Sequence, residues 1–408
     1  MAMARRGLFY TFLSLYLRVK LGLSVTETTL LASLTMIANS TSQTVVWGKL
    51  SDKYQARTSL VVIGETTAAV GYILVYFLHI HLLSTNGPIA AAYSIIGGLT
   101  LLEFFWSMSN LGWSALISDL TTSRERGRLM SVVSSVGGVG RMLGISFSAL
   151  MYDWGGEAGG FESGILFFFA SGIMLASALL IWLGTRTSER IHDSKQENAI
   201  DLKENRFSPN NHDSKAFHWF LASLLVVGLG ASSILQILIF YVELDSPIGA
   251  TSFDIAMIRN SASIATIIAS LVAGSLADRL GRKNTLGLSF MLMTITPLLY
   301  VFAQNTLQMI IFNSLSGISR ALMNVVGYLV ASDLIPPKRR GRLFGQYNAI
   351  TYISFGLAGT FVGGPIADYL INTGLSQASA YITTFQVASI TSLIGTILYA
   401  VKVKPERH

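Results

Sequence analysis

The chain reads Trp47-Gly-Lys-Leu-Ser-Asp52-Lys-Tyr-Gln-Ala-Arg57 in its first half and Ala273-Gly-Ser-Leu-Ala-Asp278-Arg-Leu-Gly281-Arg-Lys283 in its second. Asp278 falls 226 positions after Asp52, and each copy of the motif lies between two long apolar segments. A repeated basic hairpin, anchored by an aspartate between hydrophobic segments, is typical of a duplicated membrane bundle. The repeat therefore predicts an all-α polytopic membrane protein built from two related halves.

The composition separates this chain from soluble proteins. Of its 408 residues, 51% are hydrophobic and 12% are charged, whereas a soluble domain carries about 25% charged residues. The net charge is +7, but the basic residues form short clusters between apolar runs, so we expect no nucleic-acid partner. Cysteine is absent, which excludes disulfides, thiol nucleophiles and Cys-ligated metals. No cofactor or metal ion is expected, and no cleavable signal peptide is evident.

Twelve apolar runs are candidates to span a bilayer, since roughly 20 residues of helix cross about 30 Å of hydrocarbon. They lie near residues 7–21, 26–49, 58–83, 90–117, 128–152, 161–184, 218–242, 252–277, 285–304, 306–331, 342–371 and 378–401. A polar stretch separates the sixth run from the seventh, and its composition predicts a hydrophilic linker. The chain therefore divides into a six-helix bundle at 1–184, a linker at 185–217 and a second six-helix bundle at 218–408.

The distribution of Lys and Arg predicts the orientation in the membrane. One side holds the linker and the basic clusters at 49–57, 124–128, 279–283, 338–342 and 402–407. The other side holds only Arg18 and Lys20. By the positive-inside rule the hairpins, the linker and the C-terminus are cytoplasmic, and an even number of spans places the N-terminus there too. We expect the protein in the plasma or inner membrane of the cell.

A second repeat supports the first. Ile117-Ser-Asp119-Leu-Thr-Thr-Ser-Arg-Glu-Arg126-Gly127-Arg128-Leu matches Ala331-Ser-Asp333-Leu-Ile-Pro-Pro-Lys-Arg-Arg340-Gly341-Arg342-Leu at an offset of 214. With two parallel halves and a basic hairpin after the second and fourth spans of each, the whole chain resembles the major facilitator superfamily. Residues 274–283 are similar to that family's signature between spans 8 and 9, although Gln55 replaces the usual glycine in the first copy.

The resemblance implies twelve transmembrane helices in two pseudo-symmetric six-helix bundles. It also implies alternating access around a central cavity that is lined mainly by spans 1, 4, 7 and 10. In the family, carboxylates and basic residues of the hairpins pair across helices and close the cytoplasmic side. The resemblance assigns this cytoplasmic gate to Asp52, Arg57, Asp119, Arg126, Asp278, Arg282, Asp333 and Arg340. The alternative is that the basic residues only set the topology.

Ionisable residues inside the predicted spans are functional candidates, because charge within the bilayer is costly. Glu103 lies halfway along span 4, in a polar stripe formed by Glu103, Ser107, Asn110 and Ser114. Span 10 carries a similar stripe of Asn313, Ser316, Arg320 and Asn324. In the family both helices line the cavity, so we expect Glu103 and Arg320 to meet across it.

Two roles are open for Glu103. It forms an ion pair that only positions two helices, or it titrates during transport. Burial favours the protonated carboxyl and a nearby arginine favours the ionised form, so a pair that exists in one conformation makes a state-dependent proton site. Glu103 is therefore the proton-coupling candidate. Glu65, a turn or two inside span 3, is expected to pair with the nearby basic cluster.

Span 1 is expected to be short at its start. Aligned on the hairpins, span 7 maps onto positions that begin before Met1, so the recorded span 1 lacks roughly eight residues of its counterpart. Arg5 and Arg6 then fall opposite Ala231 and Ser232, near the middle of span 7. They are either mid-depth arginines or a cytoplasmic anchor of a short span.

If Arg5 and Arg6 lie at the middle depth of the membrane, their charges would favour a substrate of opposite charge. Arg5 and Arg6 would join Arg141, Arg320 and Arg259 in a cationic cavity. Guanidinium groups bind carboxylate or phosphate through two parallel hydrogen bonds, so we expect an anionic small-molecule substrate. The cavity candidates are Arg6, Tyr10, Glu103, Asn110, Arg141, Gln236, Asn313, Arg320 and Asn324.

The chain departs from the drug-efflux members of the family at two places. Those members carry an Arg early in span 4 and a Gly four residues later, where this chain has Leu99 and Glu103. Their Gly-Pro-x-x-Gly element in span 5 reads Gly140-Arg141-Met-Leu-Gly144 here. A drug/proton antiporter is weakened by these differences but stays an alternative. The glycines of spans 5 and 11 are expected to allow close helix packing.

We therefore expect a secondary active transporter that moves a small solute by alternating access, coupled to protons as a symporter or antiporter. The alternatives are drug efflux, an uncoupled facilitator or exchanger, and a non-transporting membrane receptor on the same fold. No nucleophile–base pair or metal-ligand set is visible, so an enzyme is not expected. The expected partners are the substrate, protons and the lipid bilayer, and the protein is expected to be a monomer.

Overall fold

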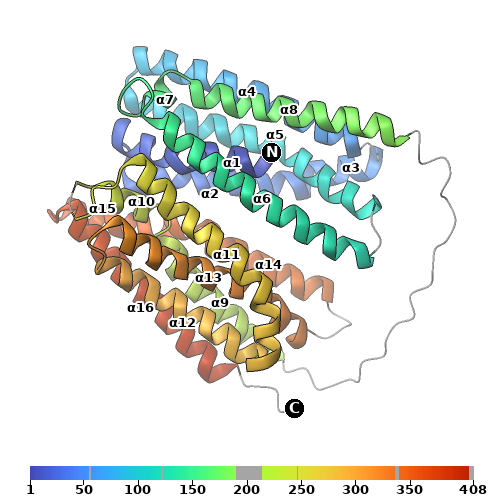
Figure 1. The fold of residues 1–408 in the computed structure, drawn as a ribbon, viewed down its shortest axis with the longest axis vertical. Helices are drawn as coiled ribbons and strands as arrows, with labels where there is room; N and C mark the ends of the chain where they lie inside the picture. Colours follow the sequence, from blue (N-terminus) through green and yellow to red (C-terminus); the bar gives the residue numbers. More distant parts are fainter. Residues whose placement is uncertain (55–56, 121–122, 190–213, 246, 336–339, 404–408) are drawn as a thin grey trace.

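The computed structural model describes residues 1–54, 57–120, 123–189, 214–245, 247–335 and 340–403. Within these ranges, the side chains at 44, 52–54, 57, 114–120, 123–131, 134, 185–189, 214 and 340–342 fall outside the description. The described chain folds into helices joined by short turns and contains no strand (Figure 1). The predicted all-α class is therefore confirmed.

The helices of the N-terminal half occupy most of the first 189 residues. They are α1 (Ala2–Leu15), η1 (Tyr16–Lys20), α2 (Val25–Ser42), η2 (Gln43–Trp47), α3 (Gly48–Tyr54), α4 (Arg57–Thr85), α5 (Pro88–Leu120), α6 (Ser123–Tyr152), α7 (Gly159–Glu162) and α8 (Ile165–Glu189). The η segments are π-helical turns that continue a neighbouring α-helix.

The C-terminal half begins after the linker. Its helices are α9 (Ser214–Ser233), α10 (Ile237–Glu243), α11 (Ser252–Leu280), α12 (Arg282–Val301), α13 (Thr306–Leu334), α14 (Arg340–Gly356), η5 (Gly359–Gly363), α15 (Gly364–Asn372) and α16 (Gln377–Lys402). α8 continues to Glu189 and α9 starts at Ser214, so both ends of the predicted linker, 185–217, are helical, and the linker itself stays a prediction. Residues 190–213 lie outside the described residues.

Each of the twelve predicted spans falls on helix. Eight helices of the described chain are long and apolar enough to cross a membrane, and a ninth span results if the bent pair Leu343–Gly356 and Gly359–Asn372 is one span, with a 46° bend. The other three predicted spans, 7–21, 26–49 and 128–152, coincide with α1–η1, with α2–η2–α3 and with α6. The polytopic architecture is confirmed, and the count of twelve stays a prediction.

Local sequence explains where the helices begin and end. Ser24 and Glu27 form a capping box at the start of α2, and Thr251 and Asp254 form another at the start of α11. Such boxes satisfy backbone N–H groups that have no partner inside the helix. In the second hairpin, Gly281 has φ 84° between α11 and α12, a conformation that glycine adopts without steric cost. The glycine of the motif is thus the residue that ends α11.

The two halves lie side by side in Figure 1, with the first in blue to green and the second in yellow to red. Contacts between the halves run along two seams, where α2 packs on α14, η5 and α15, and where α6 packs on α11. At the first seam a Cβ on Gly364 would lie 2.7 Å from Thr26 Cα. Small residues therefore let the helices approach closely, as expected for helix packing in lipid.

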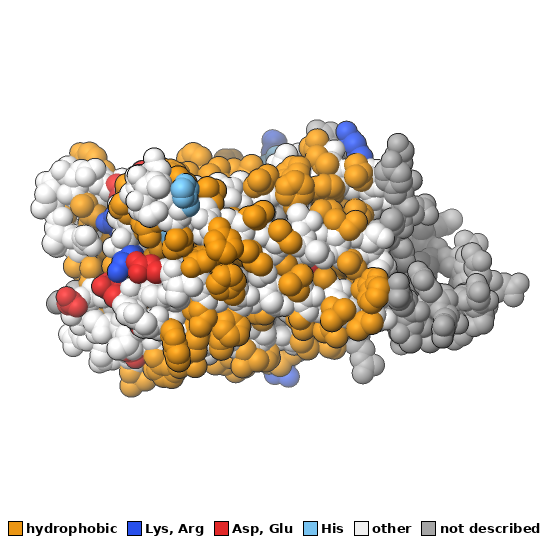
Figure 2. All heavy atoms as spheres, turned by 90° about the horizontal axis from the view of Figure 1, so that it is seen from above, with side chains coloured by type: hydrophobic (Ala, Val, Ile, Leu, Met, Phe, Trp, Pro, Cys, Tyr) orange, Lys and Arg blue, Asp and Glu red, His pale blue; other side chains and the backbone are white. Residues whose placement is uncertain are grey.

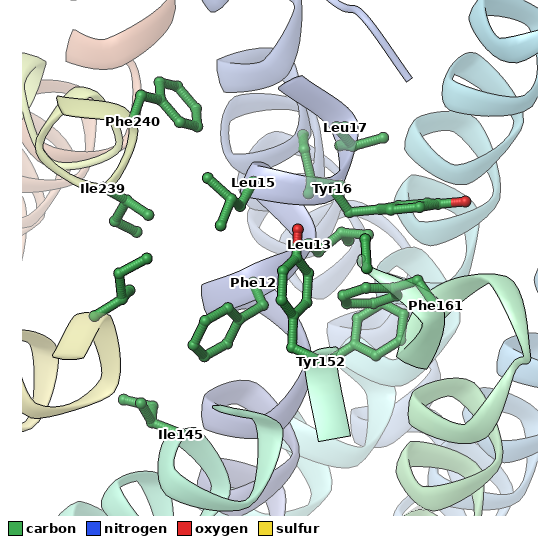
Figure 3. Packing of buried hydrophobic residues seen from close by; sticks show 14 of the residues in the cluster. Phe12, Leu13, Leu15, Tyr16, Leu17, Ile145, Tyr152, Phe161, Ile239 and Phe240 are labelled. Atoms are coloured by element: carbon green, nitrogen blue, oxygen red, sulfur yellow. The ribbon is translucent and has the colours of Figure 1, made fainter. Parts of the chain in front are cut away.

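Among the described residues, a hydrophobic cluster joins the halves at the end of the molecule that is predicted to face outward. It contains Phe12 and Leu15 of α1 together with Ile239 and Phe240 of α10 (Figure 3). A second cluster of buried residues belongs to the C-terminal half alone. From the shared cluster, the ribbons of the two halves diverge toward the opposite end (Figure 1). The conformation is therefore closed at the predicted outer side.

Polar contacts reinforce this closure, and we call them the outer clasp. The carboxylate of Asp368 in α15 accepts from the backbone N–H groups of Val25 and Thr26, at 2.8 Å each, and so caps α2 from the other half. At the second seam, Ser252 at the start of α11 donates to Asp153, which follows α6, at 2.6 Å. On the face shown in Figure 2, apolar side chains predominate over the described surface, and most of the visible acidic side chains lie at one end.

We expect replacement of Asp368 by Ala to open the outer side. The substitution leaves the first N–H groups of α2 without their acceptor, and loss of a cap costs about 1 kcal/mol, which changes an equilibrium roughly fivefold. The wild-type chain has no cysteine, so spin labels on cysteines introduced at the exposed positions Asn86 and Gln304 report the distance between the halves. The long-distance population should grow.

Asp254→Ala is the matched control, because Asp254 caps the start of its own helix α11. Its hydrogen bonds go to Thr251, in the same half of the chain. Its distance distribution should match that of the wild type. Equal distributions for Asp368→Ala and the wild type would show that the clasp does not hold the halves together.

Candidate substrate and coupling site

Glu103 lies near the middle of α5, where the carboxylate is buried with 3% exposure. Its Oε1 accepts from Arg5 Nη1 and Nη2, both at 3.2 Å, and from the Tyr10 hydroxyl at 2.9 Å. Its Oε2 accepts from Asn39 Nδ2 at 3.0 Å. Three helices, α1, α2 and α5, therefore converge on one carboxylate inside the N-terminal half.

Arg5 is the cationic partner of Glu103. Its side chain is fully buried, donates to the Tyr72 hydroxyl at 2.7 Å, and lies over the ring of Trp106 at 4.5 Å from the centroid. The expected contact between Glu103 and Arg320 is therefore wrong in this conformation. Arg5 shares the buried face of α1 with Phe9 and Phe12. Phe9 packs against Tyr72 of α4, and Phe12 packs against Tyr152 of α6. The mid-depth reading of Arg5 is the one that matches its position.

A buried ion pair of this kind resists loss of either partner. Removal of one charge leaves the other unpaired in a medium of low polarity, which costs about 3–5 kcal/mol. The hydrogen bonds from Tyr10 and Asn39 occupy further lone pairs of the carboxylate. Both oxygens of the Glu103 carboxylate are thus engaged by side chains of the N-terminal half.

A second group of arginines lies between the halves, and it consists of Arg6, Arg141, Arg259 and Arg320. All four are partly buried. The charges of Arg141 and Arg320 lie close enough to interact, as do those of Arg259 with both and of Arg6 with Arg141. Among the described side chains no carboxylate pairs with any of the four. We call these residues the arginine cluster.

Close helix packing brings Arg141 into this cluster. A Cβ on Gly144 would lie 2.1 Å from the carbonyl oxygen of Ala4, so only glycine lets α6 approach α1 this closely. Arg141 is one turn earlier on α6, on the side of Arg6, whose guanidinium lies 5.1 Å from the Trp106 centroid. The predicted packing role of the span 5 glycines is confirmed at Gly144.

A cavity opens beside the arginine cluster in the C-terminal half. It is small, with about 40 Å³ of space for water-sized molecules, and it is partly open to solvent. Arg320 and Tyr300 line it, together with Leu235 at the break between α9 and α10. Interrupted membrane helices commonly form substrate sites in transporters. Arg259 donates to the Leu235 carbonyl at 3.4 Å, so the break is held by a member of the cluster.

The remaining polar candidates behave differently. Gln236 caps α10 at the break, and its Oε1 is buried without a hydrogen-bond partner. Asn313 is buried and committed to the protein, since it accepts from the Tyr300 hydroxyl at 2.8 Å and donates to the Ile258 carbonyl at 2.5 Å. Asn110 and Asn324 lie at exposed positions of α5 and α13. Gln236 thus lies at the helix break beside the cavity-lining Leu235, whereas Asn313 positions α11, α12 and α13.

The gate residues are described only in part. Arg282 at the start of α12 pairs with Asp333 at the end of α13, and both belong to the C-terminal half. Asp278 is exposed near the end of α11. The side chains of Asp52, Arg57, Asp119, Arg126 and Arg340 lie outside the described residues. The cytoplasmic gate therefore stays a prediction.

Several residues of the site were not among the cavity candidates. They are Arg5, Asn39, Tyr72, Trp106 and Tyr300. The apolar neighbours Phe9 and Phe12 at helical spacing could have indicated that Arg5, not Arg6, faces inward. Asn39 begins a polar run in α2 that reads Asn-Ser-Thr-Ser-Gln. Tyr72 has no such polar neighbours, so only the packing of α4 on α5 reveals it.

Comparisons with known proteins identify relatives. The model of the Major Facilitator Superfamily matches residues 1–253 and 243–408. Multidrug resistance protein 2 of Bacillus subtilis is 27% identical over 272 residues, which are 64% of this chain and 62% of the relative. The inner membrane metabolite transport protein YgcS of Escherichia coli is 29% identical over 117 residues, 29% of this chain and 26% of the relative. The matches to the first curated relatives cover less than two thirds of each relative's length.

Among solved structures, the nucleoside transporter NupG is similar in fold. It has a TM-score of 0.68 and 14% identity, and the alignment covers 99% of this chain and 96% of that chain. The similarity supports the arrangement of the helices over nearly the whole length.

We expect substitution of either partner of the Arg5–Glu103 pair to destabilise the protein strongly. Glu103→Leu leaves a buried guanidinium without a countercharge, and the expected loss is about 3–5 kcal/mol. The double variant Arg5→Met with Glu103→Leu removes both charges and should recover part of that loss. The melting temperatures of Glu103→Leu, Arg5→Met and the double variant, measured by thermal unfolding in detergent, test this expectation.

Arg282→Ala is the control, because its pair with Asp333 is solvent-exposed. Exposed pairs contribute at most about 1 kcal/mol, so the melting temperature should hardly change. Equal destabilisation by Arg282→Ala and Glu103→Leu would contradict the energetic role assigned to the buried pair.

Proposed function

Since this chain belongs to the Major Facilitator Superfamily and is a multi-pass membrane transporter, we propose that it moves a small anionic solute and that protons drive the transport. The family assignment supplies the transporter class. The charge of the substrate and the coupling ion are inferred from the side chains between the two halves.

The arginine cluster is the observation that carries the anionic substrate. Its partly buried guanidiniums share one region without a described carboxylate to neutralise them, and Arg320 lines the cavity beside them. Uncompensated charge inside a membrane protein is costly, and a bound anion would remove that cost. A carboxylate or phosphate fits best, because guanidinium groups offer paired N–H donors in a fixed geometry.

Glu103 supports the coupling to protons. In this conformation Arg5, Tyr10 and Asn39 stabilise the carboxylate. If α1 moves relative to α5 when the halves rock, Arg5 leaves, and a buried carboxyl without a cation favours its protonated form. The pair therefore binds a proton in one conformation and releases it in the other, which is the requirement for coupling.

Alternating access would work through two closures. The outer clasp at Asp368 holds the described conformation shut on one side. On the other side we assign the closing contacts to the hairpin residues around Asp52, Asp119, Asp278 and Asp333, which pair when the halves rotate. The positive-inside rule places this side, the linker and both termini in the cytoplasm. We expect a monomer in the plasma membrane, with one substrate site between its halves.

Drug efflux is the second candidate, and it is supported by the name of the relative from Bacillus subtilis, multidrug resistance protein 2. A multidrug transporter of lipophilic cations would need acidic groups that face its cavity. Here the cavity side carries the arginine cluster, while Glu103 is neutralised by Arg5. A cationic drug would be repelled, so we favour the anionic solute. An uncoupled exchanger and a non-transporting receptor stay open as outcomes of the transport assays below.

We expect anionic solutes, and not lipophilic cations, to stabilise the purified protein. A ligand present at 100 times its dissociation constant adds about 2.7 kcal/mol to the folded state, so carboxylate or phosphate solutes should raise the melting temperature. Arg320→Gln and Arg141→Gln should abolish the shift. Arg279→Gln, at an exposed position near the end of α11, is the control and should keep it. Stabilisation by cations alone would exclude the anionic substrate.

We expect Glu103→Gln to uncouple transport. In proteoliposomes loaded with the stabilising solute, accumulation driven by a pH gradient should be lost, because the amide takes up no proton. Exchange of labelled for unlabelled solute should survive, because exchange needs no net proton movement. Undiminished accumulation in Glu103→Gln would contradict the coupling role, and the absence of any solute flux in the wild type would favour a receptor.

A further inference from the structure

The cavity in the C-terminal half contains a polar group whose role the proposed function leaves open, the hydroxyl of Ser232. The side chain lies in the last turn of α9 and is 4% exposed. It lines the cavity, and its Oγ is buried without a hydrogen-bond partner among the described residues. A buried hydroxyl that makes no hydrogen bond is costly. In folded proteins such a group usually has a partner, which is the protein, a water or a ligand.

The neighbouring serine shows that the helix does not impose this lack of a partner. Ser233 lies in the same turn of α9, and its hydroxyl donates to the Gly230 carbonyl at 2.8 Å, as serines in helices commonly do. Ser232 makes no such bond. Its hydroxyl is therefore free to donate to a molecule in the cavity.

The other hydroxyl groups of the cavity wall are already used inside the protein. Each of them donates to a protein oxygen at 2.7–2.8 Å, and they belong to Thr296, Tyr300, Ser316 and Ser319. Among the hydroxyl side chains that line this cavity, the one of Ser232 is thus left for a ligand.

Arg320 supplies the charge of the cavity. It lines the wall, and no described residue accepts a hydrogen bond from its guanidinium. The helices that form the wall, α9, α10, α12, α13 and α14, contain only Glu243 and Asp333 as carboxylates. Glu243 is the last residue of α10. Asp333 lies about 20 Å along α13 from Arg320 and pairs with Arg282. The cavity therefore offers a cation and a neutral donor.

The broken helix does not offer the oxygens that a cation would need. In transporters with interrupted helices, unwound backbone carbonyls can coordinate Na⁺. Here Arg259 donates to the Leu235 carbonyl, and the carbonyls of residues 232, 234 and 236 accept from backbone N–H groups at 2.9–3.3 Å. The charges of Arg259 and Arg320 disfavour a cation further. The break and the cavity together select an anion.

The size of the cavity limits the anionic group that it can hold. Its space of about 40 Å³ for water-sized molecules corresponds to about three waters, since one water needs roughly 10–15 Å³. A planar carboxylate is of this size, whereas a tetrahedral phosphate is bulkier and has more oxygens that need donors. Apolar side chains form much of the remaining wall, among them Leu238, Met293 and Phe355, and they supply no donors.

We propose that this cavity is the subsite for a single carboxylate group, held by the Arg320 guanidinium and the Ser232 hydroxyl, and that the transported solute is therefore a carboxylate and not a phosphate ester. The guanidinium offers a pair of N–H donors to the two carboxylate oxygens, and the hydroxyl donates to one of them. Since the cavity is partly open, the rest of the solute extends out of it. This inference rests on the proposed transport of an anion.

Thermal unfolding of the purified full-length protein in detergent tests the subsite with matched anions. Acetate, propionate, benzoate and succinate are each compared with the phosphonate of the same carbon skeleton, at equal ionic strength. We expect the carboxylates to raise the melting temperature and the phosphonates to leave it unchanged. In Ser232→Ala the apparent dissociation constant for the carboxylates should rise at least about tenfold, because a hydrogen bond to a charged oxygen is lost.

Ser233→Ala is the matched control, because the hydroxyl of Ser233 is used within α9, and it should keep the wild-type affinity for carboxylates. Without added anion, Ser232→Ala should melt no lower than the wild type, since the hydroxyl that it removes has no partner in the protein. A lower melting temperature of the ligand-free variant would show that this hydroxyl is bonded inside the protein, and it would overturn the subsite. Wild-type carboxylate affinity in Ser232→Ala would overturn it as well.

The same measurements separate this inference from the proposed function. Equal stabilisation by phosphonates and carboxylates would overturn the choice of a carboxylate, while the proposed transport of an anion would stand. If none of the carboxylates or phosphonates changes the melting temperature, the anionic function fails together with its subsite.

Discussion

The buried pair of Arg5 and Glu103 is the constraint on which the interior of this transporter depends. A carboxylate in the middle of an apolar helix requires compensation, and the guanidinium of Arg5 supplies it together with Tyr10 and Asn39. These contacts fix α1 and α2 against α5. Because breaking such a pair is costly, the pair resists any movement that separates α1 from α5.

The two halves differ in how their buried charges are compensated. In the N-terminal half the acidic group is neutralised inside the protein. Toward the C-terminal half, the arginine cluster has no described carboxylate, and its member Arg320 lines the cavity beside the broken helix α9–α10. In the function proposed above, the first region would handle protons and the adjoining region would bind an anion. Arg6 and Arg141 lie between the two regions. A charge bound in one region therefore changes the electrostatic potential in the other.

Closure of the outer side rests on contacts of a different kind. Close approach at Gly364, the apolar cluster around Phe12 and Phe240, and the helix cap at Asp368 all lie where α1, α2, α10 and α15 meet. None of these contacts involves a buried ion pair, so each contributes modestly and can be exchanged for others when the halves rock. Rocking of two rigid bundles needs strong contacts inside each bundle and weaker contacts between the bundles. The buried ion pair and the outer contacts fit this division.

The sequence by itself determined the class of the protein. Repeated hairpins at Asp52 and Asp278, with apolar runs between clusters of Lys and Arg, indicate a duplicated helical membrane bundle, because the bilayer forces long apolar helices and charge asymmetry on any such chain. The ionisable residues Glu103, Arg141 and Arg320 stood out for the same reason. Which arginine neutralises Glu103 and which residue of the other half caps α2 were decided by the tertiary structure. Those contacts join helices far apart in the chain, and helical spacing records only which face a residue occupies, not which neighbour that face meets.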